Sequence, residues 1–475
     1  MSVKPAPAEG FATSVPVVIV GAGAAGLCAA LAACEAGTEV IVFERDPLPR
    51  GSTALSAGLI PAAGTRFQRV LGISDSADQF AADIRRKGDD EGNAAIAELV
   101  ARESGSTVEW LADRYGFPFS LVHDFNYPGH STRRMHGLPS RSGTELVDRL
   151  HRAAEQAAIT IVCNAPVSGI FCKAEGTVCG VEFTRPDGSR DHVGCEALVL
   201  ACNGYGGAPD LVAKYIPEMH DAHYFGHPGN RGDAVLWGQA LGAKLLNMSS
   251  YQGHGSVAHP HAILITWAVI MEGGFQVNAL GRRFSNESLG YSEQAALVLA
   301  QPEGIAFDIF DERIAAIARQ FEDFRQAEAA GAVIAAERIE ELAERLKLPQ
   351  EALKETFKQV ESAKDAGVAD PFGRSFAGQA HLSLPYKAIR VTGALFHTQG
   401  GLAVDVNGRV LNEQGAPLPN LFAAGGAAAG VSGSLASGYL SGNGLLTATV
   451  LGRISGISAA AMVKSGEHKL TVRAH

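Results

Sequence analysis

A glycine-rich turn between two short apolar segments constrains the fold of this chain more than any other feature. Residues 15–20 (VPVVIV) are β-branched and apolar, which indicates a buried parallel strand, and Gly21-Ala-Gly-Ala-Ala-Gly26 follows at once. An alanine-rich helix is expected over 27–36, with Gly37 just beyond its end, and a second strand over 39–44. This strand–turn–helix–strand unit is typical of dinucleotide binding.

Each residue type in this turn has a physical reason. Gly21 allows the tight turn, Gly23 lets the backbone approach a pyrophosphate, and Gly26 lets the helix pack closely on the strand. The first N–H groups of the helix lack intrahelical partners and lie at the positive end of its dipole, so they attract phosphate. Glu44 can accept hydrogen bonds from ribose hydroxyls. The predicted cofactor contacts of this unit are Gly21, Gly23, Ala24, Ala25, Gly26, Glu44 and Arg45.

The rest of the chain divides into a nucleotide-binding region and an insertion. Residues 197–201 form another apolar strand that runs into a glycine-rich segment, and residues 420–426 form a last strand near the C-terminus. Residues 302–370 are rich in Ala, Glu, Lys and Arg and are predicted to be helical. We therefore expect an α/β fold in which a split Rossmann-like domain carries an inserted α+β capping domain. The expected boundaries are 1–248 and 396–475 for the split domain and 249–395 for the cap.

Charge and composition exclude several classes of function. The net charge is −10 and no basic block is present, which argues against nucleic acid and anionic membrane as partners. The most apolar segments, 15–20 and 197–202, are too short to cross a bilayer, so no membrane span is expected. None of the seven cysteines forms a CxxC pair, which disfavours a disulfide framework, a zinc site and a c-type haem and favours a reducing cytoplasm. His254, His259 and His261 lack regular ligand spacing, so no metal is expected.

Seven segments, in this order, resemble the flavoprotein subunits of the fumarate reductase and succinate dehydrogenase superfamily over nearly the whole chain. The segments are GAGAAG (21–26) with Glu44, GSTALSAG (51–58), NGYGG (203–207), RGDA (231–234), GRRFSNE (281–287), FHTQGG (396–401) and AAGG (423–426) leading to GNG (442–444). The resemblance implies FAD, and a mobile cap that closes over it. No histidine falls in 51–58, where covalently flavinylated members carry theirs, so non-covalent FAD is expected. The further cofactor contacts that the resemblance implies are Ser52, Thr53, Ser56, Ala57, Gly58, Val167, Asn203, Gly204, Asp233, Gly425, Gly442 and Leu445.

The chain departs from fumarate reductases at the substrate. Those enzymes clamp a C4-dicarboxylate with two histidines, a Thr-Glu pair and arginines, one of which delivers the proton. The resemblance aligns these positions with His254, Thr266, Trp267, Tyr291, Phe396 and Tyr439, and His397 falls one place after the second histidine. Both arginines are thus tyrosines here. Burying a dianion without fixed cations is costly, so the pocket suits an uncharged ring that carries one carbonyl.

Tyrosines at these two positions resemble those of 3-ketosteroid dehydrogenases and related cyclic-ketone desaturases. The overall length and the Tyr439-Leu-Ser441 segment resemble the Δ4-(5α) type. The resemblance implies dehydrogenation next to a ketone: Tyr291 takes the α-proton, and the β-hydrogen leaves as hydride to flavin N5. Tyr439 is expected to donate a hydrogen bond to the carbonyl oxygen, assisted by Ser441 or the Gly442 N–H.

The surroundings of these tyrosines are left open by the sequence. A tyrosine base needs its pKa of about 10 lowered, and His254 and Tyr251 are the candidates for doing so. Segment 127–136 concentrates a tyrosine, two arginines and two histidines, and we expect a surface loop with structural charges. An arginine from it that reached the pocket would instead bind a carboxylate and favour a small oxo-acid. The expected pocket walls are Trp267, Thr266, Phe396 and Tyr127.

Three functions remain as alternatives. The first is an FAD-dependent α,β-desaturase of a cyclic ketone, either steroid-like or a smaller alicyclic ketone or oxo-acid, with a quinone, a dye-like carrier or O₂ as the electron acceptor. The second is a reductase of an activated double bond such as fumarate or urocanate, which needs a positively charged pocket and a strong proton donor. The third is a non-catalytic electron-transfer flavoprotein, which predicts no substrate cavity between the domains.

Overall fold

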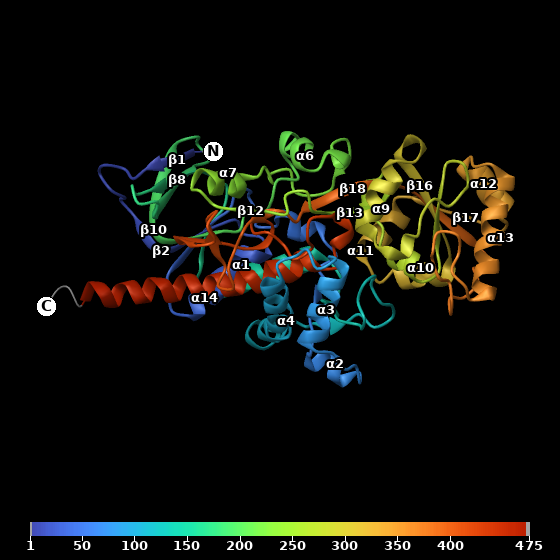
Figure 1. The fold of residues 1–475 in the computed structure, drawn as a ribbon, viewed down its shortest axis with the longest axis horizontal. Helices are drawn as coiled ribbons and strands as arrows, with labels where there is room; N and C mark the ends of the chain where they lie inside the picture. The colour runs from blue at the N-terminus through green and yellow to red at the C-terminus, as the bar shows by residue number, and fades with distance from the viewer. Residues whose placement is uncertain (1, 472–475) are drawn as a thin grey trace.

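Two regions that meet at one interface make up the fold (Figure 1). The computed structural model describes residues 2–471, with side chains as far as residue 466. The first region is built on a nine-stranded sheet, and the cap at the other end of the molecule is built on a seven-stranded sheet. The nine-stranded sheet contains β1 (Ser2–Pro5), β8 (Val167–Cys172), β9 (Val178–Thr184), β10 (Arg190–Leu200), β2 (Ser14–Val20), β3 (Val40–Phe43) and β7 (Thr160–Val162), in that order, with β21 (Pro417–Ala423) on β10 and β20 (Arg409–Leu411) on β21.

The centre of this sheet is parallel and doubly wound. Strands β21, β10, β2, β3 and β7 run parallel in that order, so their carboxyl ends meet along one edge, where ligands bind in such folds. The strands predicted over 15–20, 39–44, 197–201 and 420–426 are confirmed as β2, β3, the end of β10, and β21. The split of the domain is confirmed as well, because β21 comes from the C-terminal segment.

Helices α1 (Ala24–Glu35) and α14 (Asn443–Thr471) cross at close range. A Cβ atom added at Gly452 or Gly456 would lie only 2.4 or 2.1 Å from the carbonyl oxygens of Ala25 and Ala29. Residues 443–466 are long and apolar enough to cross a membrane by length and composition, so the prediction that only short apolar segments occur is wrong. The stretch is 61% buried inside the protein, as a core helix is.

One prediction about the cap is wrong. Residues 302–370 are not all helical, because β16 (Ile305–Asp311) and β17 (Val333–Ala336) lie within them. All seven residues of β16 are buried. The charged helices around this strand dominate the average composition of residues 302–370, so the strand does not show in that average. The other strands of the cap sheet are β11 (His223–Tyr224), β13 (Tyr251–Ala258), β14 (Ile263–Leu264), β15 (Phe275–Asn278) and β18 (Tyr386–Thr398). Its helices are α8 (Ala268–Met271), α9 (Tyr291–Leu299), α10 (Glu312–Ala318), α11 (Glu322–Ala329), α12 (Ile339–Leu346) and α13 (Gln350–Ala366).

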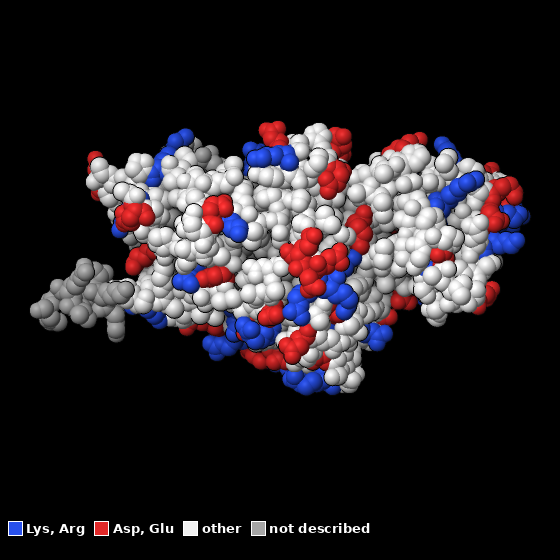
Figure 2. All heavy atoms as spheres, viewed as in Figure 1, with Lys and Arg blue, Asp and Glu red and all other residues white. Residues whose placement is uncertain are grey.

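Smaller elements complete the first region and its border with the cap. They are α2 (Arg66–Val70), α3 (Ala77–Lys87), α4 (Ala94–Tyr115), α5 (Gly143–Gln156), α6 (Pro209–Tyr215), α7 (Asp233–Ala240), the strands β4 (Ile60–Pro61), β5 (Ser120–Leu121) and β6 (Met135–Gly137), and the pair β12 (Leu245–Leu246) and β19 (Gly401–Leu402). Strand β18 continues past the predicted boundary at residue 395, and β11 joins the cap sheet from before residue 249. The boundaries themselves stay a prediction. On the face in Figure 2, acidic and basic side chains are intermixed, without a broad patch of one sign.

Candidate active site

Two connected cavities lie at the carboxyl edge of the parallel strands. The first opens beside the N-terminus of α1, at the ends of β2, β3 and β10. The predicted cofactor residues that line it are Gly21, Gly23, Ala24, Ala25, Glu44, Arg45, Ser52, Thr53, Val167, Asn203, Asp233 and Gly425. The second shares part of these walls and extends toward the cap. The predicted cofactor residues that line only the second are Ser56, Ala57, Gly58, Gly442 and Leu445.

The predicted cofactor glycines divide into those that face a cavity and those that pack. Gly23 faces the first cavity, and a Cβ there would meet only Thr53 Oγ1, at 3.3 Å. Gly26 and Gly204 line neither cavity, and their contact with the cofactor stays a prediction. A Cβ at Gly26 would lie 1.8 Å from the Gly21 carbonyl oxygen, and one at Gly204 would lie 2.0 Å from a threonine hydroxyl. These two glycines therefore serve close packing.

Charged side chains at the first cavity are held by neighbouring groups. The Glu44 carboxylate accepts N–H groups of Ala22 at 2.8 Å and Asp46 at 3.1 Å. Burial raises the Glu44 pKa, and these N–H donors partly offset that rise. Arg45 and Asp233 form an ion pair at 2.6 Å. An open helix N-terminus, a glycine that permits close approach and a buried carboxylate together fit the pyrophosphate and ribose of FAD.

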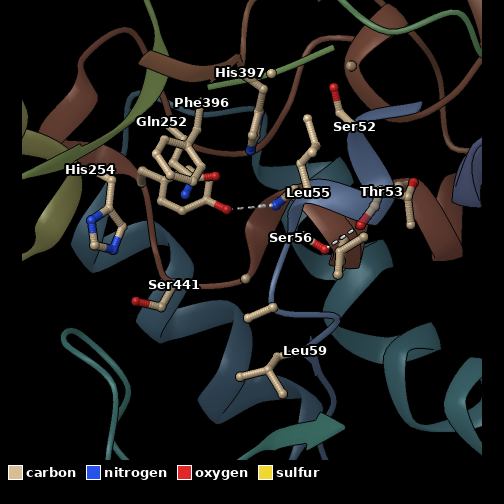
Figure 3. A pocket seen from close by; sticks show the side chains of 18 of the residues that line it. Ser52, Thr53, Leu55, Ser56, Leu59, Gln252, His254, Phe396, His397 and Ser441 are labelled. Carbon is tan, nitrogen blue, oxygen red and sulfur yellow. Dashed lines mark hydrogen bonds between the residues drawn. The ribbon is translucent and has the colours of Figure 1, made fainter. Parts of the chain in front are cut away.

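The second cavity lies between the first region and the cap and encloses about 1310 Å³ including its open mouth. In Figure 3, His254 and Phe396 of the cap lie across from Ser52, Thr53 and Ser56 of the first region. The third alternative, a purely electron-transferring flavoprotein, predicts no substrate cavity between these regions, so this cavity argues against it.

Aromatic rings form the cap side of this cavity. The Tyr291 ring stacks on His254 with centroids 4.7 Å apart, and it lies 6.0 Å from Tyr439 and 6.1 Å from Trp267. Phe396 lies 5.4 Å from His254. All four predicted pocket residues line the cavity, namely Trp267, Thr266, Phe396 and Tyr127. The sequence-predicted catalytic set is likewise brought together here, as Tyr291, Tyr439, Ser441 and His254.

The two tyrosine hydroxyls lie in a hydrogen-bonded group. Burial raises the pKa of Tyr291 to about 12, and hydrogen bonds to Ser441, the Gly442 N–H and Tyr439 partly offset that rise. The Tyr439 hydroxyl oxygen accepts the Gly444 N–H at 3.2 Å, and its pKa is raised further by burial. Both tyrosines are therefore neutral phenols at neutral pH.

Neither residue expected to lower the pKa of Tyr291 does so. The His254 Nδ1 accepts the Ser256 N–H at 3.1 Å, which leaves the ring proton on Nε2. Burial lowers the pKa of His254 to about 3, so the ring stacked on Tyr291 carries no charge. The Tyr251 phenol has its own pKa raised by burial and by Glu218, and it supplies no cation. The expectation fails because aromatic packing desolvates the site.

Segment 127–136 is only partly a surface loop: Gly129, Ser131 and Arg133 are exposed, whereas its two histidines and Arg134 are buried. It reaches the cavity through Tyr127 and Met135. Hydrogen bonding with Thr266 lowers the Tyr127 pKa slightly, but desolvation raises it more. Its arginines do not line the cavity, and no lysine or arginine among the described residues does. The possibility of a carboxylate-binding arginine from this segment is therefore not realised.

A buried ion network in this segment supports Ser441. Arg134 is fully buried and donates hydrogen bonds to Asp75 at 2.9 and 3.0 Å and to Asp83 at 2.5 Å. It also donates to His130 Nδ1 at 3.1 Å, and His130 Nε2–H donates to the Ser441 carbonyl at 2.9 Å. The arginine thus holds the loop that carries Ser441 and binds no ligand itself.

Several cavity residues were missed by sequence reasoning. They include Phe225, Gln252, Leu264, Phe321 and Asp323, and also His397, which the resemblance placed without giving it a role. Gln252 had a signal, because it precedes His254 by two on a strand and so shares its face. His397 is half-buried, and burial lowers its pKa to about 4, so it too is neutral. Phe321 and Asp323 reach the cavity only through the tertiary packing of α11, which no local pattern reveals.

Comparison with known proteins places this site in a family. The FAD binding domain family matches residues 16–445. A probable fumarate reductase of Shewanella frigidimarina (strain NCIMB 400) is 30% identical over 96% of this chain and 77% of its own length. The open conformation of a flavocytochrome c3 fumarate reductase is 28% identical with a TM-score of 0.79, over 96% of this chain and 80% of that one. A 3-ketosteroid-Δ4-(5α)-dehydrogenase from Rhodococcus jostii RHA1, in complex with 4-androstene-3,17-dione, is 25% identical with a TM-score of 0.75, over 96% of this chain and 99% of that one.

The chain therefore belongs to the FAD-binding fumarate reductase and succinate dehydrogenase flavoprotein superfamily. It is an FAD-dependent oxidoreductase that acts on CH–CH bonds. Other relatives are named as fumarate, urocanate and acrylate reductases, at 25–30% identity. The ketosteroid dehydrogenase resemblance is thus present among solved structures, whereas the names of the curated relatives are reductases.

Proposed function

We propose that the protein interconverts a cyclic ketone and its α,β-unsaturated counterpart, with desaturation of the ketone as the forward reaction. The observation that carries the proposal is the convergence of neutral tyrosines in a cavity lined by no lysine or arginine among the described residues. A dicarboxylate bound there would leave two buried charges without partners. A ring with one carbonyl needs only a hydrogen-bond donor.

Bound FAD supplies the hydride acceptor for desaturation, or the donor for the reverse reaction. Tyr439 and the first N–H groups of α14 lie together, since the Gly444 N–H donates to the Tyr439 oxygen. The positive end of this helix favours negative charge on a carbonyl oxygen that Tyr439 hydrogen-bonds. Tyr291, in the same hydrogen-bonded group, exchanges a proton with the carbon next to that carbonyl. Ser441 orients Tyr291.

The second candidate is reduction of an activated double bond, and the names of the relatives favour it over desaturation. The raised pKa of Tyr291 also supports it, because a protonated phenol gives up a proton in reduction but must first lose one to act as a base. The lack of cations in the cavity limits this candidate to substrates activated by a neutral carbonyl.

We also propose that FAD is held non-covalently, because residues 51–58 contain no histidine. The electron acceptor is proposed to be a quinone, a dye-like carrier or O₂, and the location to be the cytoplasm. A denatured holoprotein that releases all its FAD into the acid supernatant would support non-covalent binding. Flavin that stays with the precipitate would contradict it.

Anaerobic mixing of the oxidised holoenzyme with saturated ketones tests the direction. Loss of flavin absorbance with cyclohexanones or 3-ketosteroids supports desaturation. If no ketone bleaches the flavin, while enones reoxidise the dithionite-reduced enzyme, the second candidate replaces the first. Reoxidation by fumarate but by no neutral enone would refute both forms of the proposal.

A further inference from the structure

Among the described residues, one acidic or basic side chain other than histidine lines the substrate cavity, and it is an acid without a hydrogen-bonding partner in that part of the chain. Asp323 lies in the first turn of α11, on the cap side of the cavity. Its carboxylate makes no hydrogen bond or ion pair with any described residue, whereas its neighbour Glu322 pairs with Arg325. Burial raises the Asp323 pKa to about 6, and Arg325 offsets only part of that rise. The half-buried Asp323 carboxylate therefore faces the cavity without a hydrogen-bond donor from the described residues.

Asp323 lines the second cavity but not the first, which most of the predicted cofactor residues line. Phe321, beside it, packs on Phe125 with centroids 5.9 Å apart, and Phe125 packs on Tyr127 at 4.9 Å. These rings link the α11 side of the cavity to Tyr127, and Leu264 of β14 adds to its apolar wall. Asp323 shares no hydrogen bond with Tyr291 or Tyr439, so with a carbonyl held at the tyrosines it is an acceptor at a second position in the same cavity.

The charge balance of the cavity shows which ligand group suits this acid. His254 and His397 are neutral, and no lysine or arginine among the described residues lines the wall. A distal carboxylate on the substrate would be repelled, and a distal ketone would offer only another acceptor. A hydroxyl or ammonium group would satisfy the unpaired carboxylate.

We propose that Asp323 binds a hydrogen-bond donor, a hydroxyl or an ammonium group, at the end of the substrate remote from the reacting carbonyl. This inference rests on the proposed function for the placement of that carbonyl. It makes Asp323 a specificity residue rather than a catalytic one, because it touches no reacting atom. The substrate class narrows to cyclic ketones that carry a distal hydroxyl or amine.

Binding to the oxidised holoenzyme tests the proposal without turnover. Perturbation of the flavin spectrum gives dissociation constants for two matched series: 4-androstene-3,17-dione against its 17β-hydroxy counterpart, and cyclohexane-1,4-dione against 4-hydroxycyclohexanone, 4-aminocyclohexanone and 4-oxocyclohexanecarboxylate. Since the distance to the tyrosines selects the ligand size, one series is expected to respond. In the series that responds, the hydroxyl or ammonium ligand should bind about tenfold or more tightly than the dione. A hydrogen bond to a charged group typically contributes enough free energy for a difference of this size.

Three variants decide whether that preference belongs to Asp323. Asp323→Leu should abolish it, and Glu322→Leu, on the same helical turn but outside the cavity wall, should keep it. Asp323→Asn preserves the shape of the side chain, so it can be tested even if the leucine variant does not fold. It should lose the preference for the ammonium ligand and keep most of the preference for the hydroxyl ligand. Equal binding in both series, tightest binding of the carboxylate, or a preference that survives both Asp323 variants overturns the proposal. Preferential binding without any flavin bleaching would sink the proposed reaction and leave this inference standing.

Discussion

The protonation state of Tyr291 gives the two directions of the reaction different pH profiles. With a pKa of about 12, the phenolate is on the order of one part in 10⁵ at pH 7, which as a base costs about 7 kcal/mol. Because the pKa is raised, the group stays protonated below pH 12 and loses its proton only above it. As the base of desaturation, Tyr291 should therefore raise the rate tenfold per pH unit. As the acid of reduction, it should give a flat profile over the same range.

Anaerobic single-turnover measurements between about pH 6 and pH 10 separate these profiles, with flavin reduction by a saturated ketone in one direction and flavin reoxidation by an enone in the other. Tyr291→Phe should slow the favoured direction by about 10²–10⁴. Tyr386→Phe is the matched control, because Tyr386 lies at the far end of β18 and lines neither of the two cavities described. A desaturation rate that is independent of pH yet lost in Tyr291→Phe would refute the reasoning, since the phenolate would then form well below pH 7.

Two further substitutions test the scaffold. Gly456→Ala places a methyl 2.1 Å from the Ala29 carbonyl oxygen, so it should cost about 1–3 kcal/mol relative to Gly466→Ala on the same helix, which meets nothing within 4 Å. Both gain the same helix propensity, and equal melting temperatures of the holoproteins would contradict the close crossing of α1 and α14. Arg134→Met removes the ion-pair partner of the buried Asp75 carboxylate and leaves Asp83 with Arg86 alone, so it should cost about 3–5 kcal/mol in urea unfolding. A change below about 1 kcal/mol would show that the network is not structural.

The nucleotide half of the fold could be predicted because its signals are local. The glycine turn, the strand before it and Glu44 lie within thirty residues, and each is required by the same ligand geometry. The strand at 305–311 could not be predicted from average composition, because its seven buried residues contribute less to that average than the charged helices around them. A helix in the C-terminal segment is expected from the sequence, but the apolar length of α14 is not, because its apolar residues are interspersed with glycine, serine and threonine.

The substrate site was predicted in its members but not in its electrostatics. The expected cluster forms, because the Tyr291 ring lies against both His254 and Tyr439. It could be predicted because each of these residues belongs to a sequence motif of the family. The sequence suggested that His254 would activate the tyrosine, whereas burial leaves that ring neutral. Desolvation depends on every group packed around a site, including Trp267 from another segment, so it cannot be read from neighbours along the chain.

The predicted cofactor residues and the proposed substrate residues lie on different elements of the fold, so the charge of the substrate can change while FAD binding is kept. The predicted cofactor residues that line the first cavity lie mainly at the N-terminus of α1 and the carboxyl ends of the parallel strands. The groups that decide substrate charge lie elsewhere: Tyr291 begins α9, Tyr439 precedes α14, and Asp323 lies on α11. If the resemblance to fumarate reductases aligns these positions correctly, phenols replace two arginines and remove the charges that hold a dianion without touching the predicted pyrophosphate site. Asp323 is the one acidic or basic residue other than histidine that lines the cavity among the described residues, so the proposed specificity is for a ligand that is neutral or cationic where it meets this acid.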